Sequence, residues 1–366
     1  MHHCKNILKN IWIEGSAARG LRVLPCCFYI TDNDYRTIED WYDSEEYQSI
    51  KTAESWPAGC STCKRQEELN EKSYRQIANE ALENATGRRF EIFPSNVCNL
   101  KCVMCHARNS SALANEQHSL GIISNQFNKE IDLGADAINI INKYDDIDSI
   151  SLIGGEFFLA KGNIEIVELA ISKNIPVRAV TNATVIMPRH LEKLKQAGDL
   201  LELQLSCDGI HEYYELIRYP AKWDTFLNNA KRLIAELPKA KINFHFVAQP
   251  LNAKNLVPSL AFFNTLKIPT RVTNITVPEY MTWSMLTDSE REKIIATITE
   301  QLDQVDQYRL TSRQIKQVKD LVYNISKSEY SDQQRQKFNF AVGKTMQHRG
   351  VDLVVAVGLE PTINTV

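Results

Sequence analysis

From about residue 90 onward, apolar runs rich in β-branched residues alternate with stretches of helical character. This alternation constrains the fold more than any other feature. The helical stretches cover residues 162–174, 188–198, 222–237 and 254–266. The six apolar runs are FEIFP (90–94), SISLIG (149–154), PVRAVTN (176–182), LELQLSCD (201–208), KINFHFVA (241–248) and TRVTNITV (270–277). Such runs are typical of buried parallel strands, whose right-handed crossovers place helices outside the sheet. Six units are too few for a closed eight-stranded barrel. The chain is therefore predicted to be an α/β protein with an open, partial (β/α)6 barrel over residues 89–282.

The segments on either side of the barrel have other patterns. In residues 283–366, TDSE at 287–290 is a capping box that opens an amphipathic helix, and further helices are expected at 311–327 and 332–347. The end, VDLVVAVGLEPTINTV, has one strand-like run and then an expected frayed terminus. In residues 1–88, LRVLPCCFYITDND suggests a strand of a short hairpin, and residues 43–85 suggest two helices flanking a loop with a cysteine pair. We therefore expect a small cysteine-rich module, the barrel, and a helical extension.

Composition excludes several classes of protein. The chain has 366 residues, a net charge of −3 and 43% hydrophobic residues, so nothing general draws it to nucleic acid or to an anionic membrane. No apolar run approaches the roughly 18–20 residues of a membrane span, and the start, MHHCKNILKN, lacks the apolar core of a signal peptide. A cytoplasmic location is expected. In that reducing compartment clustered cysteines indicate metal binding or catalysis, and eight of the nine cysteines precede residue 106.

Three of these cysteines form one motif. Cys98, Cys102 and Cys105 have the spacing C-x3-C-x2-C in FPSNVCNLKCVMCHARNSS (93–111), directly after the first predicted strand. A structural zinc site uses four protein ligands, whereas three thiolates on a [4Fe–4S] cluster leave one iron free for a small molecule. The loop should lie at the carboxyl end of the sheet, where α/β barrels place their sites. An open position favours chemistry over a purely structural role.

Polar groups follow the next strands at the same end of the sheet. The second strand ends in Gly154, Gly155 and Glu156, the third in TNAT and the fourth in SCDG. Two glycines allow backbone carbonyls to approach a ligand closely, and Glu156 can accept hydrogen bonds from an amino group. Alone, GGE is a weak signal that also fits a plain turn. Because it follows the strand next after the three-cysteine loop, GGE is here a strong signal of a ligand site.

C-x3-C-x2-C after the first strand and GGE after the second resemble the radical S-adenosylmethionine (radical SAM) superfamily. The resemblance covers about residues 90–280. The alternative interpretation of the three cysteines is a structural zinc site or another kind of iron–sulfur site. It implies that the three cysteines hold a [4Fe–4S] cluster, whose fourth iron binds the amine and carboxylate of S-adenosylmethionine. The residues 154–156 would hold the amino group. Reductive cleavage would then yield a 5′-deoxyadenosyl radical.

The resemblance extends to further residues. Those implied to face the ribose and the methionine carboxylate are Thr181, Asn182, Ser206 and Asp208. Arg218 stands where relatives often have an arginine for that carboxylate, and Val247 and Gln249 would flank the adenine. Met104 replaces the usual aromatic residue before the third cysteine, and methionine can still pack on a purine. Cys207, on a predicted strand, is interpreted as a buried core thiol.

The front cysteines resemble a twitch-type auxiliary module, related to the SPASM modules of peptide-modifying radical enzymes but placed before the barrel. The resemblance implies that Cys4, Cys26, Cys60 and Cys63 bind a second [4Fe–4S] cluster, with Cys27 as the alternative to Cys26. A four-cysteine zinc site is the competing interpretation.

This resemblance implies an enzyme that abstracts hydrogen from an unactivated carbon. A peptide or protein side chain is the first expectation for the substrate, and a flavodoxin or ferredoxin is the expected electron donor. One alternative is a radical SAM enzyme acting on a nucleotide, a sugar or another small metabolite. The other is a non-enzymatic iron–sulfur or zinc protein that acts as a sensor or binding module.

Overall fold

A single curved sheet organises the computed structural model, which describes residues 4–16, 20–53, 55–68, 72–124 and 130–359. Its strands lie in the order β2-β1-β3-β4-β5-β6-β7-β8. Their bounds are β1 Asn10–Ser16, β2 Gly20–Leu24, β3 Arg88–Ile92, β4 Ile147–Leu152, β5 Val177–Thr181, β6 Leu201–Ser206, β7 Lys241–Ala248 and β8 Thr270–Asn274. All pairs from β3 to β8 are parallel, so the six strands predicted for the barrel are confirmed.

The front segment joins this sheet through its hairpin. The strands β1 and β2 pair antiparallel, and β1 also pairs parallel with β3, with Ile13 opposite Ile92. The Phe93 N–H extends the pairing by donating to the Ile13 carbonyl at 2.7 Å. The predicted hairpin is therefore present. Contrary to the expectation of a module set apart from the strand–helix pattern, it lengthens the barrel sheet from six strands to eight.

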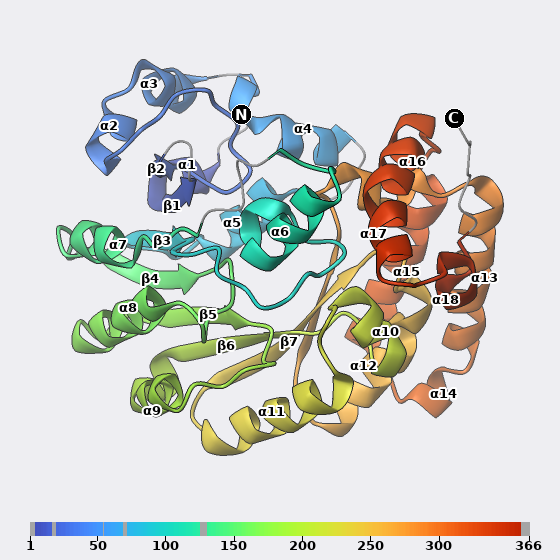
Figure 1. The fold of residues 1–366 in the computed structure, drawn as a ribbon. Coiled ribbons are helices and arrows are strands. Elements are labelled where there is room, and N and C mark those ends of the chain that lie inside the picture. The colour runs from blue at the N-terminus through green and yellow to red at the C-terminus, as the bar shows by residue number, and fades with distance from the viewer. Residues whose placement is uncertain (1–3, 17–19, 54, 69–71, 125–129, 360–366) are drawn as a thin grey trace.

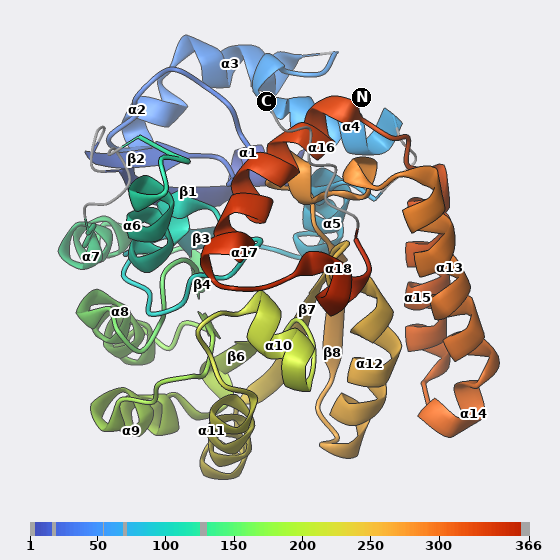
Figure 2. The same ribbon diagram turned by 45° about the vertical axis from the view of Figure 1, so that its right-hand side comes forward.

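Helices flank the sheet (Figures 1 and 2). Those of the front segment are α1 Lys5–Lys9, α2 Ile38–Tyr42, α3 Glu45–Thr52, α4 Ser61–Glu68 and α5 Tyr74–Ala81. Those of the barrel are α6 Ser111–Ser119, α7 Gly134–Ile141, α8 Lys161–Ser172, α9 Pro188–Ala197, α10 His211–Ile217, α11 Trp223–Glu236 and α12 Leu256–Thr265. None of the described helices is both long enough and apolar enough to cross a membrane.

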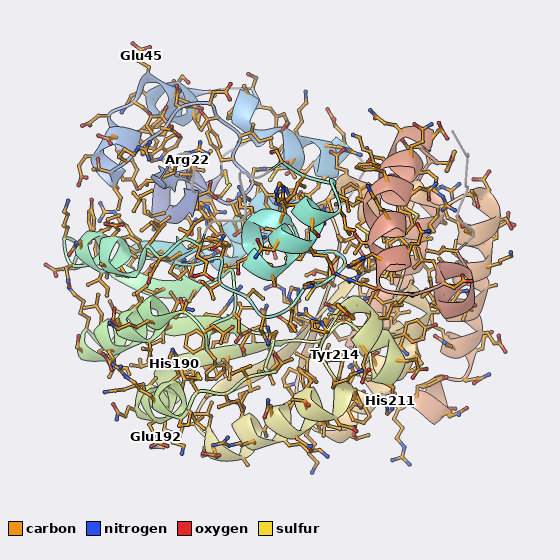
Figure 3. The ribbon with its side chains drawn as sticks, viewed as in Figure 1. Arg22, Glu45, His190, Glu192, His211 and Tyr214 are labelled. Carbon is orange, nitrogen blue, oxygen red and sulfur yellow. The ribbon has the colours of Figure 1, made fainter. Side chains whose placement is uncertain are left out.

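Side chains fill the space between sheet and helices (Figure 3). Tyr214, labelled there on α10, is fully buried, and its ring centroid lies 4.7 Å from that of Phe226 on α11. Phe244 on β7 stacks on Phe263 on α12 at 4.5 Å. The aromatic layer thus links helices to the strands that end at the candidate site.

The chain after the barrel is helical, as predicted. Its helices are α13 Asp288–Asp303, α14 Val305–Tyr308, α15 Ser312–Lys327, α16 Asp332–Phe338, α17 Lys344–His348 and α18 Leu353–Val357, with a π-helical turn at Asn339–Gly343. Thr287 caps α13 with Glu290 in the predicted capping box. The buried Glu290 also pairs with Arg335 of α16 at 2.9 Å.

The predicted strand-like run after residue 350 is wrong. Its apolar residues form the short helix α18 instead. A helix satisfies its backbone polar groups internally. The terminal residues 360–366, where fraying was expected, lie outside the described residues.

Candidate active site

The three-cysteine loop opens into a cavity of about 610 Å³ at the carboxyl ends of the strands, called here the cluster cavity. Ten residues proposed from the sequence line it: Cys98, Cys102, Met104, Cys105, Gly154, Gly155, Thr181, Asn182, Ser206 and Arg218. They come from the loops after β3, β4, β5 and β6 and from the end of α10. One edge of the sheet therefore collects most of the residues that the resemblance implied.

Two glycines allow the loop after β4 to press against the cysteine loop. Gly154 and Gly155 have φ of +95° and +55°, a region that L side chains rarely adopt. A Cβ on Gly155 would lie 2.6 Å from the Ser95 carbonyl oxygen and 2.7 Å from that of Val97. The Glu156 N–H donates to the same Val97 carbonyl at 2.8 Å. The glycine pair thus fixes the backbone immediately before Cys98.

Glu156 is buried behind this loop and does not line the cavity. Its carboxylate accepts hydrogen bonds from Thr181 Oγ1 at 2.5 Å, the Asn182 N–H at 2.7 Å and the Phe158 N–H at 3.1 Å. Burial raises the pKa of Glu156, and these hydrogen bonds oppose the shift. The sequence predicts that this carboxylate accepts hydrogen bonds from a ligand amino group. In the structure its hydrogen-bond donors belong to the protein, so Glu156 positions the end of β5.

Arg218 connects the end of β6 with the cysteine loop. Its guanidinium forms an ion pair with the buried Asp208 at 2.6 Å and donates toward Cys102 Sγ at 3.9 Å. Asp208 Oδ1 accepts from the Val247 N–H at 2.7 Å. Asp208 lies behind the cavity wall, so it orients Arg218 and does not face a ligand directly.

Two residues proposed for adenine contact lie elsewhere. Val247 lines a neighbouring cavity described below, and the side chain of Gln249 is fully buried and lines neither of the two cavities. Both amide atoms of Gln249 lack a hydrogen-bond partner among the described residues. Cys207 is also fully buried, and its thiol donates to the Gly209 carbonyl at 3.2 Å, as expected for a core thiol.

The C-terminal extension holds the cysteine loop from the outside. Arg349, which follows α17, donates to the Lys101 carbonyl at 2.7 Å. It also pairs with Glu116 of α6 at 2.5 Å, and both side chains are almost fully buried. The cysteine loop is also held from the barrel side, where the Lys101 N–H donates to the Tyr219 carbonyl at 2.7 Å. The extension therefore contributes directly to the conformation of the site.

The thiols fit the [4Fe–4S] cluster that the resemblance implies. Hydrogen-bond donors point at two of the sulfurs: the Leu100 N–H lies 3.5 Å from Cys98 Sγ, and Arg218 approaches Cys102 Sγ. Such donors favour thiolates, the form that binds metal. Burial, and then the neighbouring Cys102, raise the pKa of Cys98 to about 12, so a bound cation is needed to ionise it at neutral pH.

The front cysteines gather in a second place. Burial, and then Cys4 and Cys63, raise the pKa of Cys60 to about 12, and Cys26 likewise interacts electrostatically with Cys4 and Cys63. Cys27 instead lines the cluster cavity. Cys27 also interacts electrostatically with Cys26 and Cys63, so it lies near the other front cysteines as well as on the wall of the cluster cavity. Within the described residues, no three His, Cys, Asp or Glu side chains are arranged around a single metal-ion position.

Charged residues deeper in the barrel, which were not predicted from the sequence, also face the cluster cavity. Arg89 and Glu91 on β3, Arg178 on β5 and Arg271 on β8 also line the cluster cavity, together with Tyr74 of α5. The signal was available, because charged residues interrupt runs that otherwise read as buried strands. In a barrel the face opposite the helices can be polar if it surrounds a ligand.

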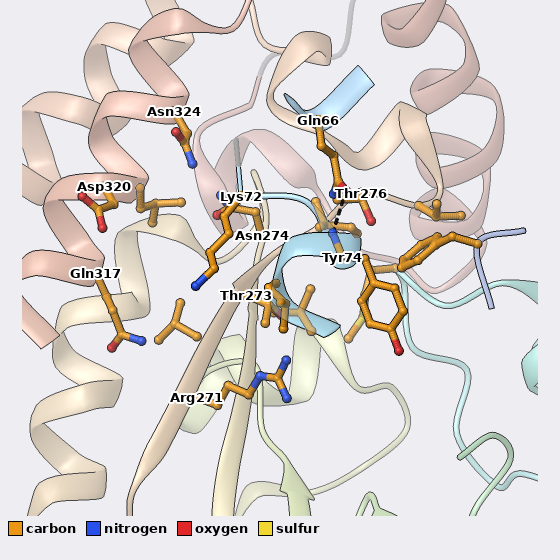
Figure 4. A pocket seen from close by; sticks show the side chains of 18 residues that line it. Gln66, Lys72, Tyr74, Arg271, Thr273, Asn274, Thr276, Gln317, Asp320 and Asn324 are labelled. Atoms are coloured by element: carbon orange, nitrogen blue, oxygen red, sulfur yellow. Dashed lines mark hydrogen bonds between the residues drawn. The ribbon is translucent and has the colours of Figure 1, made fainter. Parts of the chain in front are cut away.

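A second cavity of about 560 Å³ runs along β8, and we call it the edge cavity (Figure 4). The front segment, residues 271–277 and helix α15 line it, and the amides among its lining residues are Gln66, Asn274, Gln317 and Asn324. Both cavities share the wall residues Phe28, Tyr74, Ile77, Met104, Arg271 and Val277. The edge cavity therefore adjoins the cluster cavity at the open side of the barrel.

Known proteins similar to this chain include members of one enzyme superfamily. Residues 92–260 match the radical SAM superfamily. A probable GTP 3′,8-cyclase of Methanocaldococcus jannaschii is 27% identical over 180 residues, which cover 48% of this chain and 54% of that protein. The chain thus spans about half the length of that curated relative.

Solved structures are similar at lower identity. Streptococcus suis SuiB bound to precursor peptide SuiA is 17% identical, with a TM-score of 0.44, over 77% of this chain and 56% of that one. The protein anSMEcpe with bound AdoMet and Cp18Cys peptide is 17% identical, with a TM-score of 0.42, over 59% and 58%.

The family match begins within β3 and ends within α12, and it includes the cysteine loop and the GGE segment. Radical SAM domains work with a [4Fe–4S] cluster and S-adenosylmethionine. Residues 92–260 of this chain thus form a domain of the radical SAM superfamily.

Proposed function

We propose that this chain is a radical SAM enzyme that abstracts a hydrogen atom from a substrate bound in the cluster cavity. The observation that carries the proposal is the convergence of Cys98, Cys102 and Cys105 with the glycine pair on one cavity. When bound, the cluster and S-adenosylmethionine supply a 5′-deoxyadenosyl radical. A flavodoxin or ferredoxin is the proposed electron donor.

The protein side chains have separate roles in this proposal. The three cysteines hold the cluster, and Thr181, Asn182 and Ser206 offer hydrogen bonds to S-adenosylmethionine. Gly154 and Gly155 bring the backbone close to the cavity. Glu156, Asp208 and Arg218 keep these groups in place through the contacts described above. The barrel wall excludes water from the reacting atoms.

A peptide or protein side chain is the proposed substrate. Two features of the edge cavity support this proposal. Amide side chains line it and can hydrogen-bond to peptide groups. In addition, β8 pairs only with β7 among the described strands, so its outer backbone edge can receive an extended peptide. A peptide lying along β8 could place one side chain in the cluster cavity.

A nucleotide or another small anionic metabolite is the second candidate. The curated relative named as a probable GTP 3′,8-cyclase favours it, as does the excess of arginines in the cluster cavity. The two candidates differ in substrate and share the same radical chemistry.

The front cysteines are proposed to bind an auxiliary [4Fe–4S] cluster. The electrostatic interactions that link Cys26 and Cys60 with Cys4 and Cys63 support this proposal. Cys27 interacts with Cys26 and Cys63 too, and Cys26 is favoured over it as the ligand because Cys27 lines the cluster cavity. Such a cluster would lie beside the substrate and could bind it or accept an electron from it.

Production of 5′-deoxyadenosine tests the proposed activity. The chain is reconstituted anaerobically with iron and sulfide, then incubated with S-adenosylmethionine and dithionite. We expect the parent to form 5′-deoxyadenosine, and Cys98→Ala, Cys102→Ala and Cys105→Ala each to abolish it, because no other cysteine lines this part of the cavity at their spacing. Cys207→Ala is the matched control, since Cys207 lies in the core. A parent that forms none would support the non-enzymatic alternative, and a single mutant at the parent rate would remove that cysteine from the site.

A further inference from the structure

The charges that line the cluster cavity do not balance. Its acidic residues are Glu14 and Glu91, and its arginines are Arg89, Arg108, Arg178, Arg218 and Arg271. Glu91 takes a hydrogen bond from Arg89 at 2.9 Å, and Glu14 lies 3.6 Å from Arg108. Arg218 pairs with Asp208 behind the wall. Two arginines remain.

The side chains of Arg178 and Arg271 make no hydrogen bond or ion pair with any residue that the structure describes. The buried Nε of Arg178 has no partner at all among these residues. Both side chains line the cluster cavity. Burial, and then the like charge of Arg178, lower the pKa of Arg271. A folded protein that keeps two such groups in one cavity gains stability when an anion binds between them.

Other polar groups nearby do not remove this excess. His245, opposite Arg271 on β7, is neutral, because burial and then the arginines around it lower its pKa to about 3. Glu202 on β6 draws the pKa of Arg271 upward but forms no ion pair with it, and its carboxylate accepts from Asn243 at 3.1 Å. The excess positive charge therefore faces the cavity.

Building on the proposed function, we propose that Arg178 and Arg271 bind an anionic group of the substrate, a carboxylate or a phosphate. The planar guanidinium matches both groups with two parallel hydrogen bonds. Arg178 precedes Thr181 by three residues on β5, so this anion site lies roughly 10 Å below the carboxyl end of the strand. The anionic group would anchor the substrate deep in the barrel, and its reacting carbon would extend toward the cysteine loop.

Isothermal titration calorimetry on the reconstituted holoenzyme tests this inference. S-Adenosylmethionine is present at saturation and no reductant is added, so the cofactor site is filled and no turnover occurs. The probes are inorganic phosphate and succinate, and the uncharged dimethyl succinate is the control ligand. We expect at least one of the two anions to bind, and dimethyl succinate not to bind. Tighter binding of phosphate indicates a phosphate ester as the substrate, and tighter binding of succinate indicates a carboxylate.

Matched variants locate the binding. Arg178→Gln and Arg271→Gln should each weaken the binding of the anion by about tenfold or more, because each removes one charged hydrogen-bond donor. Arg178→Lys keeps the positive charge, so its affinity for the anion should fall less than that of Arg178→Gln. Arg232→Gln is the control, because Arg232 pairs with Glu236 on the surface of α11 at 2.7 Å. Each variant is checked for its fold by circular dichroism, and Arg271→Gln carries the test if Arg178→Gln does not fold.

Two results would overturn the inference: a parent holoenzyme that binds neither anion, or glutamine variants that bind the anion as tightly as the parent and Arg232→Gln. Formation of 5′-deoxyadenosine is measured on the same preparation with reductant added. Lack of anion binding with this activity intact refutes the anion site alone. Anion binding without this activity refutes the proposed function alone.

Discussion

Replacing Gly155 by alanine tests whether the glycine pair exists to admit the cysteine loop. Alanine at a left-handed φ costs about 1–2 kcal/mol. The new Cβ would also lie 2.6 Å from the Ser95 oxygen and 2.7 Å from the Val97 oxygen, both of them backbone atoms that cannot rotate away. Overpacking of this kind adds about 1–3 kcal/mol. The free energy of unfolding should therefore fall by roughly 2–5 kcal/mol.

Gly121 provides the matched control for this prediction. Its φ is +66°, yet nothing lies within 4 Å of the position that its Cβ would take. Gly121→Ala should cost only the backbone part, about 1–2 kcal/mol. Urea denaturation followed by circular dichroism gives both values, and iron analysis after reconstitution should show a loss of iron only for Gly155→Ala, because Val97 adjoins Cys98. Equal stability and equal iron content in the two variants would refute the reasoning.

Further substitutions examine other parts of the molecule. Cys26→Ala should reduce the iron held after reconstitution from about eight to about four atoms per chain, whereas Cys27→Ala should leave about eight; one zinc and no additional iron in the parent would contradict an auxiliary iron–sulfur cluster. Arg335→Met leaves the buried charge of Glu290 without its partner, and urea denaturation should show a loss of about 3–5 kcal/mol. Replacing both residues by methionine should recover most of that stability, and no recovery would speak against the unpaired charge as the cause. Arg349→Gln removes a contact to the cysteine loop, so reconstituted protein should lose iron faster on dilution into a chelator; an unchanged rate would show that the loop does not need it.

The strands of the barrel were predictable because their composition is local. Runs such as KINFHFVA combine β-branched and aromatic residues with short length, and β7 occupies all of it. The capping box at Thr287 likewise depends on neighbours in the sequence. The pairing of β1 with β3 was not predictable in this way, because it joins segments about 80 residues apart through backbone hydrogen bonds. The run that forms α18 was predicted wrongly because a short apolar run fits a strand or a buried helix equally well, and only its tertiary contacts decide between them.

Some residues of the candidate site were predictable from the sequence and others were not. The cysteine spacing and the glycine pair are motifs that a sequence displays directly. Arg178 and Arg271 are single charged residues within apolar runs, and only the curvature of the open sheet shows that they face one cavity. The role of Glu156 also needed the structure, because two of its hydrogen-bond donors, Thr181 and Asn182, lie at the end of a different strand.

The hairpin that joins the barrel sheet affects how the chain can be divided. A shortened protein that began at residue 89 would remove β1 and leave one side of β3 without a partner. Exposed strand edges recruit other chains, so such a protein should aggregate even if its cysteine loop and its barrel helices were intact. The segment before residue 89 therefore cannot be replaced by an unrelated module without loss of a strand from the sheet. Any exchange of front modules between related proteins would have to carry over the strand that pairs with the barrel.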